Sequence, residues 1–200
     1  MEASDLPCIA HLKNGKGATL SLAEANDGPG LLQFYRDMPE EDRLALKEDV
    51  TTSDWLDRFL ARLASGEAIS IVGKVAGEIR GEATLYRTLH GWTRHVGEIR
   101  LNVDRAVRGH GLGLELARHV VKIAIDSGID KLVAHMVDTQ VAAKRTFTKL
   151  GFHKEAELAK HVTDIHGKRL DLLIYANDVS HIWSAMETLL GDFRPDRATR

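Results

Sequence analysis

The sequence predicts a mixed α/β domain, and three features carry that prediction. Apolar and polar residues alternate in short runs of the first half, as at 68–72 (AISIV), which is typical of strands. A glycine-rich turn at 109–113 follows such a run and opens an amphipathic helix. Strand and helix patterns then alternate. The chain has 200 residues, 44% of them hydrophobic, which is enough for the core of one domain.

The first elements are weakly marked. The stretch 1–17 is expected to be a flexible N-terminal arm, followed by a short strand at 18–22. Pro29 suits the first turn of a helix that runs through Tyr35, and 39–42 suits another helical turn.

A better-marked helix follows. Ser53 is the expected N-cap and Gly66 the expected end, with Trp55 and Phe59 in an apolar stripe that is expected in the core. The acidic run at 39–49 has two interpretations: a solvated face, or a rim that attracts a cationic amine.

The remaining elements suggest a strand meander and then alternating strands and helices. Strands are expected at 68–72, 79–87, 95–103, 131–137, 156–163 and 170–176. Helices are expected at 112–127, 140–150 and 179–190. The domain would therefore span 18–178, with a C-terminal helix and polar tail at 179–200. The apolar stripe of that helix would pack on its own domain or on a second copy, so a homodimer is one possibility.

Composition excludes several classes of protein. Lys+Arg number 27 against 29 Asp+Glu, a net charge of −2, so the basic excess of a nucleic-acid-binding protein is absent. A single cysteine, Cys8, rules out an internal disulfide and a cysteine-based zinc site. The histidines follow no metal-ligand spacing, and we expect no metal. Because the start is acidic and no long apolar run occurs, we expect a cytoplasmic protein that does not bind membranes.

The glycine-rich turn is the informative motif. In 101–113 (LNVDRAVRGHGLG) an apolar strand leads through three alternate glycines into a helix. Glycine lets backbone N–H groups converge on an anion, and the helix N-terminus adds further unpaired N–H groups. The run therefore predicts a phosphate cradle. It lacks the third glycine of a dinucleotide fingerprint and the lysine of a P-loop. A turn that merely starts a helix is the plain alternative.

This run, with its pattern R-x-x-G-x-G, resembles the acetyl-CoA signature of the GNAT superfamily of N-acetyltransferases. The resemblance continues through the helix at 112–127, the strand at 131–137 and the segment 143–152, which is similar to the family's helix ending in Gly-Phe. It implies a mixed, mostly antiparallel sheet flanked by helices, with two strands that splay at the CoA site. It covers roughly 68–176.

The resemblance also implies a cofactor and its contacts. Acetyl-CoA would be the co-substrate, its pantetheine lying in the gap between the splayed strands and its pyrophosphate on the loop. The residues that would contact it are Leu101, Val103, Arg108, Gly109, His110, Gly111, Leu112, Gly113, Gln140 and Phe147. Two of these depart from the family: Gln140 stands where an asparagine is common, and Phe147 where many members have a tyrosine as general acid.

Glu98 is the candidate general base. Gly97-Glu98-Ile99 resembles the segment in which several members carry a catalytic glutamate, and strand alternation puts Glu98 on the same face as Arg100. The alternative is a polar strand residue paired with Arg100 or Arg94. His135 is expected to be a hydrogen-bonded histidine, with a proton relay as the less favoured role, and Trp92 is a candidate for a site wall.

We therefore expect an N-acetyltransferase that moves acetyl from acetyl-CoA to a primary amine by direct attack in a ternary complex. The acceptor would be a small molecule or a protein amino group. A non-catalytic acyl-CoA sensor is the alternative, and Phe147 is the feature that favours it.

Overall fold

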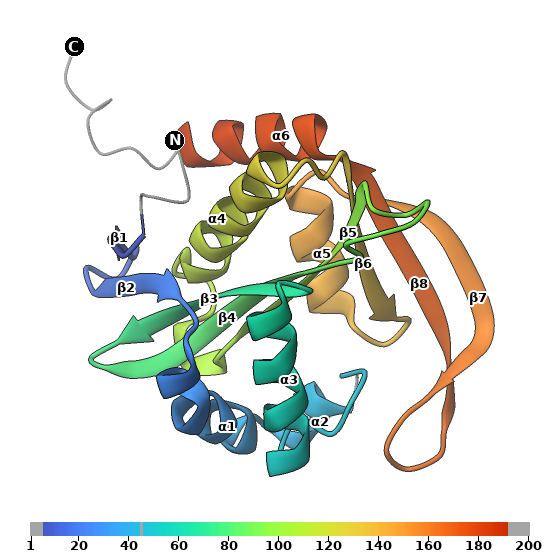
Figure 1. Ribbon diagram of the computed structural model, residues 1–200, viewed down its shortest axis with the longest axis horizontal. Coiled ribbons are helices and arrows are strands. Elements are labelled where there is room, and N and C mark those ends of the chain that lie inside the picture. Colours follow the sequence, from blue (N-terminus) through green and yellow to red (C-terminus); the bar gives the residue numbers. More distant parts are fainter. Residues whose placement is uncertain (1–5, 45, 192–200) are drawn as a thin grey trace.

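The computed structural model describes residues 6–44 and 46–191 and shows an open eight-stranded sheet (Figure 1). The strands are β1 (Cys8–His11), β2 (Gly17–Leu22), β3 (Ala68–Val75), β4 (Glu78–Arg87), β5 (Val96–Val103), β6 (Lys131–Val137), β7 (His153–Thr163) and β8 (Arg169–Asp178). Their order across the sheet is β1-β2-β3-β4-β5-β6-β8-β7. Only the β5–β6 pair is parallel. The mixed, mostly antiparallel sheet is thus confirmed.

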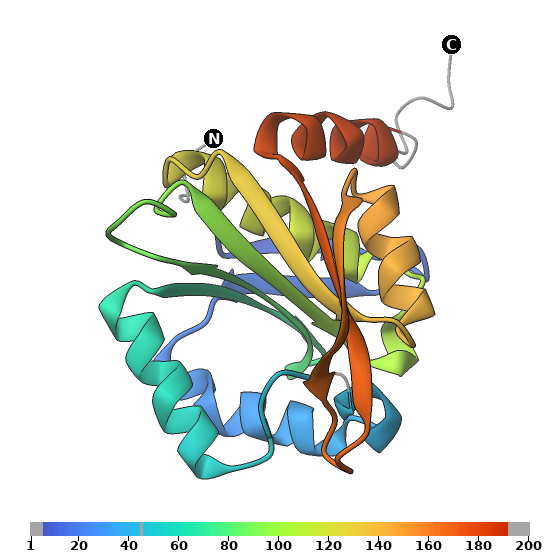
Figure 2. The same ribbon diagram turned by 90° about the vertical axis from the view of Figure 1, so that its right-hand side faces the viewer.

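Helices cover both faces of the sheet. They are α1 (Gly28–Asp37), α2 (Glu40–Arg43), α3 (Ser53–Ser65), α4 (Leu112–Asp126), α5 (Val141–Lys149) and α6 (Val179–Gly191). Helices α1 and α3 lie on one face, while α4 and α5 lie on the other (Figure 1). Figure 2 shows the connection between α2 and α3 rising toward the strands beside the β7–β8 hairpin. No helix in 6–44 or 46–191 is long and apolar enough to cross a membrane.

Two sequence-based expectations are corrected near the N-terminus. The expected arm at 1–17 contains β1, which pairs with β2 and extends the sheet, while 1–5 lie outside the described residues. The N-cap of α3 is Thr52, not Ser53, because the Thr52 side chain accepts a hydrogen bond from the N–H of Trp55 at 3.1 Å. Thr52 and Ser53 are adjacent and both carry a hydroxyl group, so the sequence alone did not distinguish which of them caps the helix.

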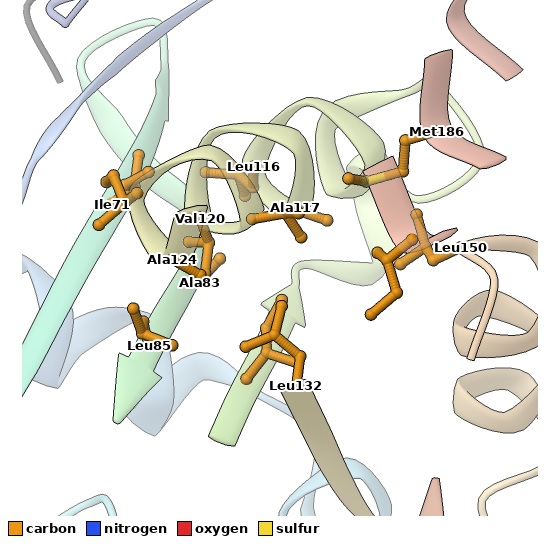
Figure 3. Packing of buried hydrophobic residues seen from close by; sticks show 14 of the residues in the cluster. Ile71, Ala83, Leu85, Leu116, Ala117, Val120, Ala124, Leu132, Leu150 and Met186 are labelled. Atoms are coloured by element: carbon orange, nitrogen blue, oxygen red, sulfur yellow. The ribbon is translucent and has the colours of Figure 1, made fainter. Parts of the chain in front are cut away.

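The larger core lies between the sheet and helices α4, α5 and α6. Side chains of β3, β4 and β6 meet α4 there (Figure 3). Helix α4 can approach closely because Gly73 and Gly81 lack side chains: a Cβ at Gly81 would lie 2.8 Å from Cδ1 of Leu116. Close packing holds the start of α4, and with it the glycine-rich turn, against the strand ends.

A smaller core lies under α1 and α3. Trp55 is 3% exposed and Phe59 2%, and their rings stack at 5.2 Å, so both belong to this core as predicted. The edge of the Tyr35 ring meets Trp55 at 5.0 Å. This side of the sheet carries the polar groups of the candidate site.

Helix α6 closes the far side of the larger core. Ile182 is fully buried and Met186 is 1% exposed, and Met186 lies beside Leu150 (Figure 3). The apolar stripe of α6 therefore packs on its own domain. The polar tail predicted after it, 192–200, lies outside the described residues.

Candidate active site

The two parallel strands separate midway along their length. Residues 96–98 of β5 pair with 131–133 of β6, and Glu98 opposite Val133 is the last pair. Beyond it β5 continues to Val103 and stays paired with β4 alone. The backbone of Leu101 and Val103 therefore has N–H and C=O groups along the β6-facing edge that the sheet does not use. The Val103 carbonyl accepts from Arg108, and the remaining groups suit an extended ligand lying in the gap.

The glycine-rich turn lies at the end of that gap. Gly109 (φ 77°) and Gly111 (φ 99°) both adopt left-handed backbone, and Gly111 is the N-cap residue of α4. Gly111 has no side chain that could cap α4, so the first N–H groups of the helix lack a side-chain partner from the N-cap residue. Gly113 is the second residue of α4, and a Cβ there would lie 3.3 Å from Cγ2 of Val103, so a larger residue would crowd the end of β5.

These features fit the pyrophosphate of coenzyme A. The Nδ1 atom of His110 is buried without a hydrogen-bond partner in the described chain, so the loop holds one more polar atom than its own contacts satisfy. Leu112 is fully buried and packs in the larger core, so its contact with a cofactor stays a prediction. The helix dipole and the first N–H groups of α4 favour an anion here.

Arg108 is held in place by the chain itself. Its Nε donates to the carbonyl oxygen of Val103 at 2.8 Å, and its Nη2 lies 2.7 Å from Oδ2 of Asp42 in α2. Arg105 meets the same carboxylate with two nitrogens, each at 2.9 Å. Burial raises the pKa of Asp42, but the hydrogen bonds from Arg105 and Arg108 outweigh that effect and lower it overall. The acidic run thus pairs with the segment that leads into the glycine-rich turn, which neither sequence interpretation of that run anticipated.

Glu98 projects from β5 toward the α1 and α3 side, as alternation predicted. Its Oε2 lies 2.7 Å from Nζ of Lys47 and 3.4 Å from Nδ1 of His135, and its Oε1 accepts from Nε of Arg100 at 2.8 Å. The Glu98–Arg100 ion pair of the alternative interpretation is therefore present. The side chain keeps 18% of its surface exposed, so a substrate can still reach it.

The charge of Glu98 is strongly stabilised. Burial by itself raises the pKa of Glu98, but hydrogen bonding with His135 and the positive charges of Arg100 and Lys47 outweigh it and hold the pKa well below its usual range. Glu98 is therefore a carboxylate throughout the neutral pH range. It can orient an amine and accept its proton transiently, but it does not stay protonated.

A cleft of about 640 Å³ opens beside Glu98. Its walls include Arg62 of α3, Tyr86 of β4 and the loop that joins β4 to β5. The guanidinium of Arg100 stacks over the Tyr86 ring at 4.2 Å. Trp92, in the same loop, is 90% exposed and does not line the cleft, so its expected role as a site wall finds no support.

Gln140, the N-cap residue of α5, and Phe147 of α5 are the two predicted cofactor contacts of this region, and both side chains have partners within the domain. The side-chain oxygen of Gln140 accepts from the N–H of Val137 at 2.9 Å. Phe147 is 6% exposed and packs edge-to-face on Phe152 at 5.1 Å. Both lie on the β6 side of the gap, and their contact with a cofactor stays a prediction.

Sequence reasoning missed three residues of this site. Lys47 comes from the connection between α2 and α3, Asp42 from α2, and Glu82 from β4. Glu82 is 2% exposed and accepts from the Tyr35 hydroxyl at 2.8 Å and from Ser70 Oγ at 2.8 Å. The sequence could have pointed to Glu82, because a glutamate in the middle of the strand run EIRGEATLYR is unusual. Lys47 and Asp42 stand in a charged segment with no distinguishing pattern.

Comparison with known proteins decides the family. The model of the acetyltransferase (GNAT) family matches residues 29–152. This chain belongs to the GNAT acetyltransferase family. It is thus an acyltransferase, and the family's members use acetyl-CoA.

Two relatives of this GNAT enzyme cover most of its length. The candidate phosphinothricin acetyltransferase YwnH of Bacillus subtilis (strain 168) is 30% identical over 81% of this chain and 99% of its own. The L-methionine sulfoximine/L-methionine sulfone acetyltransferase of Pseudomonas paraeruginosa (strain DSM 24068 / PA7) is 29% identical over 78% of this chain and 91% of its own.

Solved structures share the fold of this GNAT enzyme. A GNAT-family acetyltransferase from Streptococcus pneumoniae matches with a TM-score of 0.69 and 24% identity over 80% of this chain and 98% of its own. The candidate acetyltransferase yncA from Salmonella typhimurium, solved with its cofactor acetyl-CoA, matches with a TM-score of 0.68 and 23% identity over 81% and 94%.

Proposed function

We propose that this enzyme transfers the acetyl group of acetyl-CoA to the primary amine of a small amino-acid-like acceptor, by direct attack within a ternary complex. One observation carries the proposal: the Glu98 carboxylate stands where β5 and β6 part, at one end of the gap whose other end is the glycine-rich turn. An amine held by Glu98 would thus approach a thioester lying in the gap.

Each part of the site has a role in this proposal. The loop from Arg108 to Gly113 would bind the pyrophosphate, and the free edge of β5 at Leu101 and Val103 would hold the pantetheine. A backbone N–H on that edge would polarise the thioester carbonyl and stabilise the oxyanion. Acetyl-CoA supplies the activated acyl group, and CoA leaves as a thiolate that needs no strong acid because a thiol pKa is near 8.5. Phe147 is compatible with this chemistry.

Glu98 would accept the proton of the amine, with His135 as the next acceptor. Because the pKa of Glu98 is low, its side chain is ionised and can accept a proton, but it then transfers that proton to another group. His135 Nδ1 lies 3.4 Å from Glu98 Oε2 and is the nearest titratable group on β6. The proton-relay role of His135 therefore gains support from its position.

The acceptor class is inferred from charge and from the relatives. The Pseudomonas relative is named for two derivatives of methionine, which carry an amine beside a carboxylate. Arg62 and Arg100 lie near the cleft beside Glu98, and either guanidinium can pair with a carboxylate while Glu98 holds the amine. We therefore favour an amino-acid-like molecule over a protein amino group. The cytoplasmic location and the possible homodimer stay predictions.

The test combines cofactor binding with turnover. Purified protein is titrated with acetyl-CoA by calorimetry, with NAD as the comparison, and is then assayed for thiol release against amino acids and matched amines that lack the carboxylate. We expect acetyl-CoA binding, no NAD binding, and turnover only with the carboxylate-bearing amines. Turnover restricted to protein amino groups would overturn the acceptor class.

A matched variant tests Glu98. Glu98→Gln is expected to lower turnover by on the order of 10²–10⁴-fold while acetyl-CoA affinity stays within about twofold. The loss is expected across about pH 5 to 9, since the low pKa of Glu98 keeps it ionised there. Unchanged turnover would remove Glu98 from the reaction.

A further inference from the structure

The side chain of Lys47 occupies the place where an acceptor amine is expected. Its Nζ lies 2.7 Å from Oε2 of Glu98 on β5 and 2.5 Å from Nδ1 of His135 on β6. Glu98 belongs to the last pair between the two strands, and His135 stands two residues beyond that pair on β6. The amine of Lys47 therefore bridges the two strands at the point where they part, which is the mouth of the gap.

The surroundings of Lys47 favour its reaction. Partial burial lowers the pKa of Lys47, the opposing pull of Glu98 is weaker, and Arg100 lowers the pKa further, so more of the reactive neutral amine is present. Glu48 also lies near and pairs with Arg62 and Arg100. The side chain is 36% exposed and comes from the connection between two helices rather than from the sheet.

We propose that Lys47 is an internal acetyl acceptor, modified by the enzyme's own acetyl-CoA. The inference rests on the proposed function. The neutral Nζ attacks the thioester carbonyl carbon, the new N–C bond forms, and the C–S bond breaks to release the CoA thiolate. The proton lost from Nζ passes to Glu98 or His135 and then to solvent or the thiolate. The step needs no oxidant or reductant.

The modification would change the acceptor site. An acetylated lysine carries no charge and cannot pair with a carboxylate as an ammonium does. Glu98 would keep Arg100 and His135 as partners and would be open to an external amine. The unmodified lysine, in contrast, competes with any external amine for Glu98.

Lys74 provides a matched control within the same chain. Its Nζ lies 2.6 Å from Oδ1 of Asp27 and its side chain is 32% exposed, so it resembles Lys47 in ion pairing and exposure. It stands on β3, which β4 separates from β5 in the sheet. Lys74 therefore reports the uncatalysed rate of acetylation for an ion-paired lysine, above which Lys47 also gains from its lowered pKa.

The experiment follows labelled acetyl incorporation by peptide mass spectrometry. Wild-type, Glu98→Gln and Lys47→Arg proteins are incubated with isotopically labelled acetyl-CoA at several protein concentrations. We expect Lys47 to be labelled at least about 100-fold faster than Lys74, at a rate independent of protein concentration. Glu98→Gln should bring Lys47 down to the level of Lys74, and Lys47→Arg should leave that peptide unlabelled.

Two results would overturn the inference. One is labelling of Lys47 no faster than Lys74; the other is labelling of Lys47 that is the same in Glu98→Gln. The same samples are titrated with acetyl-CoA and assayed on amino acids. Binding and turnover without Lys47 labelling reject this inference alone, whereas loss of acetyl-CoA binding rejects the proposed function as well.

Discussion

Asp42 and Arg108 form an ion pair of 2.7 Å that ties helix α2 to the glycine-rich turn. Arg105 shares the same carboxylate. Four residues after the end of α2, the same chain segment places Lys47 on Glu98. One short segment thus contacts both the loop expected to bind phosphate and the carboxylate expected to bind the amine.

Asp42→Asn is expected to tighten acetyl-CoA binding by about threefold at low ionic strength. The substitution removes a negative charge beside the phosphate loop, while the Val103 carbonyl still holds Arg108. Calorimetry at two salt concentrations checks this, and the gain should shrink as salt screens the charge. Asp126→Asn, which removes a charge paired with Lys122 at the other end of α4, is the control. Weaker binding by Asp42→Asn would show that orienting Arg108 matters more than the repulsion.

Gly111→Ala and Gly15→Ala form a matched pair. Both glycines have positive φ, 99° and 78°, and a Cβ at either would meet nothing within 4 Å. Each substitution should therefore cost roughly 1–2 kcal/mol of folding stability from backbone strain. Only Gly111→Ala should also weaken acetyl-CoA binding, by roughly tenfold or about 1.4 kcal/mol, because its methyl group faces the phosphate site. Equal affinities in the two variants would exclude the loop as the pyrophosphate site.

Glu82 is expected to make stability depend on pH in the direction opposite to most carboxylates. Burial raises the pKa of Glu82 and outweighs the hydrogen bonds from Tyr35, Ser70 and Asn102. The folded state therefore favours the protonated form, so its stabilising contribution is present below the unfolded pKa of about 4.3 and is lost as pH rises toward the folded pKa.

Glu82→Gln removes that titration. In denaturant unfolding, the variant should gain stability relative to the wild type as pH rises from about 4 to 7. Asp54→Asn, at a side chain that is 80% exposed, is the control for a surface carboxylate. A stability difference that stays constant over this range would contradict the raised pKa.

Met186→Ala is expected to destabilise the domain by about 2–5 kcal/mol, because the side chain is 1% exposed in the larger core. Glu187→Ala, on the exposed side of the same helix, should change stability by less than about 0.5 kcal/mol. Thermal or denaturant unfolding checks both. Equal effects would mean that α6 contributes little to the core.

The sequence by itself determined the elements with strong periodicity and the loop between them. The strand at 131–137 has the predicted bounds, and α4 differs from its predicted range by one residue, because apolar spacing and glycine ends are local signals. The glycine run also indicated a turn with positive φ values, and two of its glycines do adopt φ values that other residues avoid. Strand β1 was missed because a short edge strand owes its form to its partner rather than to its own pattern.

Only the tertiary structure decided what surrounds Glu98. Alternation placed its side chain on a face, but Lys47 reaches it from 51 residues earlier in the chain and His135 from another strand. Such contacts depend on how the helices cross the sheet, which no local pattern encodes. The same holds for Asp42, which follows two other acidic residues on α2 and is set by the fold against both Arg105 and Arg108.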